Sequence, residues 1–138
     1  MPVAAAIAFT WLGMVLAISF LEAPLKFRAP GVTLPLGLGI GRVVFAALNR
    51  VEALFAAALV ACLVAGPRTV AAVVLGAAVV LVLLVQLVAV RPALTRRSDR
   101  VLAGETGPRS HAHFGYIGLE VLKVAALVAF GVLALLSP

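Results

Sequence analysis

Residues 69–90 read TVAAVVLGAAVVLVLLVQLVAV, a run in which Gln86 is the only polar side chain after the first residue. As an α-helix this run would be about 33 Å long, which matches the roughly 30 Å hydrocarbon core of a bilayer. A helix on the surface of a soluble protein carries a polar face, and this run has none. It therefore predicts a transmembrane helix.

The whole chain has the composition that this stretch implies. Of its 138 residues, 64% are hydrophobic and 12% are charged, whereas soluble domains are roughly 45–50% apolar and about 25% charged. The net charge of +6 does not indicate nucleic-acid binding, because no basic segment carries interleaved aromatic residues. The solvent of this protein is therefore largely lipid.

Three further stretches are long and apolar enough to span a bilayer. With the first stretch they predict one all-α domain, an integral membrane four-helix bundle over residues 1–138. The four predicted helices are 3–21, 41–65, 69–90 and 115–136. Between them, 22–40 contains three prolines and several glycines and is expected to be irregular or a broken helix, and 91–114 is expected to be a polar loop.

Basic residues predict the orientation of the bundle. Loops 22–40 and 91–114 with their flanking helix ends hold eight of them, and the opposite side holds only Arg68. The eight are Lys26, Arg28, Arg42, Arg91, Arg96, Arg97, Arg100 and Arg109. By the positive-inside rule both loops are cytoplasmic and both termini lie outside, and we expect the bacterial inner membrane.

The two halves of the chain follow a similar plan. Each has an apolar helix, a connector with proline and basic residues, and a helix with charges near its start. The connectors begin APLKFR at Ala23 and RPALTR at Arg91. This pattern is compatible with a parallel two-helix repeat.

The polar residues gather in the half of the bundle that is expected to face the cytoplasm, where they predict a polar pocket. The candidate pocket residues are Glu22, Arg42, Asn49, Glu52, Gln86, His113, Glu120 and Lys123. Glu52 and Lys123 both lie roughly 20 Å from the outer ends of their helices at 1.5 Å per residue. Charges at this depth should face the bundle interior and pair. They form either a structural network or a site for a ligand or protons, with Glu52 the side chain expected to be most sensitive.

Other motifs in the chain give weaker signals. His111 and His113 would chelate a metal only in an extended loop, since they diverge on a helix, and no other Cys or His is near enough to complete a zinc site. Gly37, Gly39 and Gly41 indicate flexibility before the second helix rather than a phosphate loop. No catalytic Ser or Cys stands out, so we expect neither an enzyme nor a bound cofactor.

The layout resembles the small four-helix membrane family that includes transmembrane protein 205 and bacterial membrane proteins, near the copper-resistance D-type domain. The resemblance is carried by Trp11-Leu12-Gly13, Pro24–Phe27, Phe45–Arg50, Arg91-Pro92 and His113-Phe114-Gly115. It implies fold and membrane location more than an activity. A copper role lacks support, because the chain has no Met-rich or Cys-rich cluster.

These features favour a binding, transport or accessory module that handles a small solute or ion. One alternative is a structural subunit of a larger membrane complex, and another is a haem- or metal-handling protein. A homo-oligomer is expected, because Ala57, Ala61 and Ala65 form a small-residue stripe that allows helices to approach closely. The same stripe could instead pack within the monomer.

The predicted orientation can be tested by cysteine labelling. A cysteine that replaces Ser98, in the second basic connector, should be protected from a membrane-impermeant thiol reagent in intact cells. It should react once the membrane is opened. Labelling from outside in intact cells would show that the orientation is the reverse of the predicted one.

Overall fold

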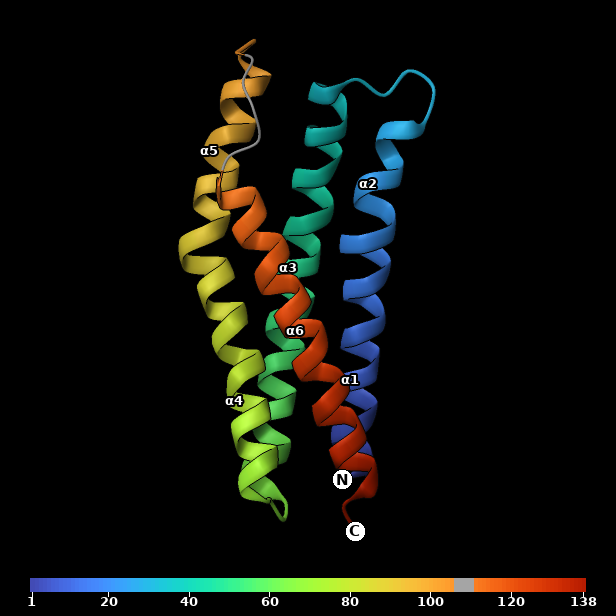
Figure 1. The fold of residues 1–138 in the computed structure, drawn as a ribbon, viewed down its shortest axis with the longest axis vertical. Coiled ribbons are helices and arrows are strands. Elements are labelled where there is room, and N and C mark those ends of the chain that lie inside the picture. Colours follow the sequence, from blue (N-terminus) through green and yellow to red (C-terminus); the bar gives the residue numbers. More distant parts are fainter. Residues whose placement is uncertain (106–110) are drawn as a thin grey trace.

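A computed structural model describes residues 1–105 and 111–138. Within these ranges, four helices are long and apolar enough to cross a membrane: Pro2–Arg28, Leu34–Ala65, Val70–Leu102 and His111–Leu136. This confirms the predicted all-α fold, and the chain is a multi-pass membrane protein built as a four-helix bundle (Figure 1).

Two of the four spans change helix type along their length. The first runs through α1 (Pro2–Val15), the π-helix η1 (Leu16–Glu22), α2 (Ala23–Leu25) and the 3₁₀ turn η2 (Lys26–Arg28). The third runs through α4 (Val70–Val85), the π-helix η3 (Gln86–Val90) and α5 (Arg91–Leu102). The second and fourth spans are the single helices α3 (Leu34–Ala65) and α6 (His111–Leu136).

The four spans pack as a ring in which α6 and α3 each contact both α1 and α4. The two termini and the α3–α4 turn lie at one end of the bundle, which we call the terminal end (Figure 1). The connection from η2 to α3 and the end of α5 lie at the other end, which we call the connector end. The basic residues of both connectors are therefore gathered at one end, apart from Arg109, which lies outside the described residues.

The predicted helix boundaries were too short at the connector end. Most of 22–40 and much of 91–114 is helical, since α3 begins at Leu34, α5 continues to Leu102 and α6 begins at His111. Prolines misled the prediction. Pro35 lies in the first turn of α3, where its missing N–H interrupts no helical hydrogen bond.

Pro24 and Pro92 lie within continuous helical spans, and a π-helix precedes each of them. Proline in a helix removes one hydrogen bond and clashes with the carbonyl four residues earlier. A π turn widens the helix at that point, as single-turn π-bulges do elsewhere. The amide of Ala23 accordingly donates to the Ile18 carbonyl, and the amide of Arg91 donates to the Gln86 carbonyl. The chain therefore continues as a helix through both prolines.

Small residues allow close packing in the terminal half. Ala4, Ala5 and Ala8 of α1 are buried in the same cluster as Leu127 and Phe130 of α6. In contrast, Ala57, Ala61 and Ala65 are all exposed. Their stripe therefore faces outward rather than into the bundle, and the alternative that it packs within the monomer is wrong.

Gly131 provides a test of the α1–α6 packing. A Cβ at this position would lie 2.7–3.0 Å from three ring atoms of Phe9, whereas a Cβ at Gly118 of the same helix would meet nothing within 4 Å. We expect Gly131→Val to lower the unfolding temperature in mild detergent, because Phe9 must move away from α6. Gly118→Val, which makes the same change in helix propensity, is the control. Equal decreases of the unfolding temperature in the two variants would contradict the close packing of Phe9 against Gly131.

Candidate functional site

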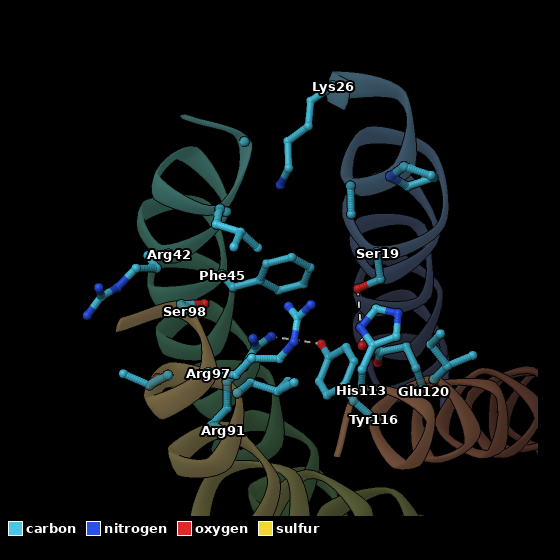
Figure 2. A pocket seen from close by; sticks show the side chains of 18 of the residues that line it. Ser19, Lys26, Arg42, Phe45, Arg91, Arg97, Ser98, His113, Tyr116 and Glu120 are labelled. Atoms are coloured by element: carbon cyan, nitrogen blue, oxygen red, sulfur yellow. Dashed lines mark hydrogen bonds between the residues drawn. The ribbon is translucent and has the colours of Figure 1, made fainter. Parts of the chain in front are cut away.

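A pocket of about 760 Å³ opens at the connector end of the bundle. Its walls come from η1 and the segment that follows it, from the first half of α3, from α5 and from the start of α6 (Figure 2). Among the described residues, four cationic side chains line it, namely Lys26, Arg42, Arg91 and Arg97. Glu120 is the one carboxylate among the described lining residues. The pocket is therefore strongly biased toward positive charge.

Arg91 is held between two aromatic rings. Its guanidinium carbon lies 4.3 Å from the ring centre of Phe45 and 4.5 Å from that of Tyr116, and its terminal nitrogen donates a hydrogen bond to the Tyr116 hydroxyl at 3.0 Å (Figure 2). Stacking on aromatic faces suits a planar guanidinium. Arg91 forms no ion pair with a described carboxylate, and its buried Nε atom lacks a hydrogen-bond partner. A positive group is thus fixed in place and incompletely satisfied.

Lys26 approaches the pocket from the end of the first span. Its ammonium lies 3.8 Å from Glu22 and 5.8 Å from the centre of the Phe45 ring. The predicted glycine-rich flexible segment is instead part of α3, and a Cβ at Gly41 would lie 2.9 Å from the Lys26 ammonium. A Cβ at Gly37 would overlap the ring of Phe27. These two glycines therefore provide the space that Lys26 and Phe27 occupy.

The other two cations differ in how they are paired. Arg42 donates to Asp99 of α5 at 2.7 Å, in a contact that is exposed to solvent. This pair joins α3 to α5, although exposed pairs contribute only about 0–1 kcal/mol. Arg97 forms no ion pair with any carboxylate in the described part of the chain. Arg91 and Arg97 are thus the lining cations without a carboxylate partner there.

Beneath the pocket lies a buried polar network centred on Lys123. The Lys123 ammonium lies 2.5 Å from Glu52 of α3 and 2.7 Å from Glu120, and it donates to the Gln86 side-chain carbonyl at 2.8 Å. All four side chains are buried, and Lys123 has 0% exposure. The network joins α3, η3 and α6 at a depth where an unpaired charge would be costly.

The first span joins the network through two further hydrogen bonds. The indole N–H of Trp11 donates to Glu52 at 2.8 Å, and the Ser19 hydroxyl donates to Glu120 at 3.1 Å. Each of the four spans therefore supplies at least one polar group to the network around Lys123. Ser19 and Glu120 also line the pocket, so the base of the pocket and the top of the network share these residues.

The structure divides the predicted polar residues into three groups. Arg42, Asn49, His113 and Glu120 line the pocket, whereas Glu52, Gln86 and Lys123 lie below it with Glu120 in the network. Glu22 is not among the lining residues, and pairs with Lys26 instead. Lys123, which the sequence places at the same depth as Glu52, contacts it directly.

Several residues of the site were missed by the sequence reasoning. The sequence predicts a loop at Arg91, but Arg91 is helical and stacks between Phe45 and Tyr116. Trp11 is a second such residue, because its indole N–H is a donor within an apolar helix and therefore needs a partner when buried. That requirement was the available signal for a polar acceptor on a facing helix.

The two histidines do not act together. They lie in the first turn of α6, where residues two apart point in different directions, and only His113 lines the pocket. Within residues 1–105 and 111–138, no group of three or more His, Cys, Asp or Glu side chains could hold a metal ion.

No protein-family description, curated protein or solved structure matches this chain significantly. The resemblance to the family that includes transmembrane protein 205 therefore stays a prediction, and the function has to be argued from the geometry of the site.

From these contacts we expect substitution of Lys123, rather than of Glu52, to destabilise the protein most. Lys123→Met would leave two buried carboxylates without their ammonium, and removing one partner of a buried pair costs about 3–5 kcal/mol in soluble proteins. Glu52→Gln should cost much less, because Glu120 still pairs with Lys123 and the glutamine carbonyl can still accept from Trp11. Unfolding followed through the fluorescence of the single tryptophan would measure both.

The double variant provides the control for this comparison. Glu52→Gln combined with Lys123→Met should be more stable than Lys123→Met alone, because it leaves one buried carboxylate rather than two. Equal losses for the two single variants, or no gain in the double variant, would contradict the central role of Lys123.

Proposed function

We propose that this protein is a membrane-embedded binding module for small organic anions that carry an apolar part. The observation that carries the proposal is the pocket of about 760 Å³, whose described lining residues include four cations and one carboxylate. Arg91 and Arg97 have no described carboxylate partner. A bound anion would supply the missing negative charge, and charge-assisted hydrogen bonds are the stronger kind.

The apolar part of the ligand is inferred from the other lining residues. Phe20, Phe27, Phe45 and Ile117 contribute to the walls, and ligand pockets commonly combine such walls with a few placed polar groups. An anion that binds Arg91 would therefore have aromatic surface beside it. A fully hydrated inorganic anion would leave that surface without a partner.

The depth of the pocket in the bilayer also suits a ligand with a charged part and an apolar part. Counted from the terminal ends of their helices at 1.5 Å per residue, Glu120 lies about 24 Å and Arg91 about 32 Å along the bundle. A hydrocarbon core of about 30 Å would then end between the base of the pocket and its cationic wall. With the connector end in the cytoplasm, as the basic residues favour, the pocket would receive ligands from the cytoplasmic side.

Hexanesulfonate is a suitable probe because it carries a fixed negative charge and a short apolar chain. We expect saturable binding to the purified protein in a neutral maltoside detergent, measured by titration calorimetry. Arg91→Gln should weaken it about tenfold or more, because a hydrogen bond to a charged group contributes roughly 1.5–3 kcal/mol. Hexanol, which lacks the charge, should not compete.

Arg50→Gln is the matched control, because Arg50 is exposed on α3 and is not among the lining residues. Its affinity for hexanesulfonate should equal that of the parent protein. Absence of saturable binding, or equal loss in the Arg50 and Arg91 variants, would overturn the proposal. If sulfate bound as tightly as hexanesulfonate, the proposal that the ligand carries an apolar part would be wrong.

A further inference from the structure

The buried network carries one more negative charge than positive charge. It contains two carboxylates, Glu52 and Glu120, and one ammonium, Lys123, while Gln86 is neutral. Both carboxylates are 1% exposed. A net charge inside a membrane bundle is costly. One proton would make the network neutral.

Glu120 is the carboxylate whose surroundings suit that proton. One oxygen of Glu52 already contacts two donors, the Lys123 ammonium at 2.5 Å and the Trp11 indole at 2.8 Å. Glu120 accepts from Ser19 through Oε2, whereas its Oε1, 2.7 Å from the Lys123 ammonium, accepts no hydrogen bond from the described residues. Because Glu120 also lines the pocket, a proton can reach it from the water there.

The charged and polar neighbours of Glu120 link it to the cations of the pocket. Tyr116 lies between them, since its hydroxyl accepts from Arg91 at 3.0 Å and interacts with Glu120. The groups that face Glu120 directly or through one intervening side chain include Ser19 of η1, Glu52 of α3, Gln86 of η3, Arg91 of α5, and Tyr116 and Lys123 of α6. The imidazole of His113, also on α6, lines the same pocket (Figure 2).

We propose that Glu120 takes up one proton when an anion binds in the pocket, so that anion and proton bind together. The proposal rests on the proposed anion site. In the unliganded protein, Arg91 offsets part of the excess negative charge from the pocket side. A bound anion shares that positive charge and adds its own negative charge near Glu120. A proton from water on the Glu120 carboxylate removes the resulting repulsion, and it returns to water when the anion leaves.

This coupling has a reciprocal consequence. If the anion promotes protonation of Glu120, protonation must strengthen anion binding by the same factor. Anion affinity should therefore fall as the pH rises, by about tenfold per pH unit where one proton is taken up for each anion. Co-binding of an anion and a proton is the property that a proton-coupled carrier of organic anions requires.

Titration calorimetry with hexanesulfonate tests the proposal, because this probe does not itself titrate near neutral pH. Repeating the titration in buffers of different ionisation enthalpy gives the number of protons taken up. In the parent protein we expect an uptake that approaches one proton per anion in the pH range where the affinity falls about tenfold per pH unit. In Glu120→Gln we expect no uptake and an affinity independent of pH. Glu105→Gln, a change at an exposed carboxylate outside the pocket, should behave as the parent.

Infrared difference spectra of the parent protein give a second measurement that does not depend on a variant folding. Adding hexanesulfonate should produce the band of a protonated carboxyl group, and Glu120→Gln should lack it. Anion binding without proton uptake at any pH from about 5 to 9, a range that spans the usual titration of carboxyl and imidazole groups, would overturn the coupling but leave the anion site standing. Uptake that persists in Glu120→Gln and disappears in His113→Gln would also overturn it. No binding of hexanesulfonate would overturn both proposals.

Discussion

The arrangement of the bundle depends on the need to neutralise one ammonium group within the membrane. Lys123 is fully buried, donates hydrogen bonds to Glu52 of α3 and Gln86 of η3, and forms an ion pair with Glu120 of its own helix. An apolar contact between helices in lipid has little directional preference, because lipid tails are as apolar as the side chains. Hydrogen bonds to one cation do have direction. The network therefore specifies how the helices are rotated about their axes, which the apolar faces alone do not.

The π-helices matter because they change this rotation along two of the spans. The π-helix η1 contains Ser19, and η3 begins at Gln86, so both widened turns lie at the level of the network. A π turn holds more residues than an α turn, so the face that a helix presents differs on its two sides. On the terminal side of η1, the first span contributes apolar packing and the Trp11 hydrogen bond to the network. From η1 toward the connector end, the same span lines the pocket. One bundle can thus be tightly packed at one end and open at the other.

The parts of this structure that the sequence predicts are those that depend on one helix at a time. Four apolar runs predict four spans, and equal depth predicts that Glu52 and Lys123 meet. The lengths of the helices were wrong because prolines were treated as breaks. The placement of Arg91 between Phe45 and Tyr116 requires the helix order, the continuation of α4 into α5 and the rotation introduced by a π turn. The sequence pattern of a single helix contains no information about any of these three features.

The glycines at the rim of the pocket have a further consequence. Gly37 and Gly41 give α3 a bare surface, and the space beside it is filled by Phe27 and Lys26, whose far ends can move. The base of the pocket is different, because the hydrogen-bonded network holds Glu120 in place. Such a pocket can adapt at its rim, where Lys26 and Phe27 lie, and is rigid at its base, where Glu120 lies. An anion bound as proposed would meet a fixed group at its charged end and side chains that can rearrange around the rest of it.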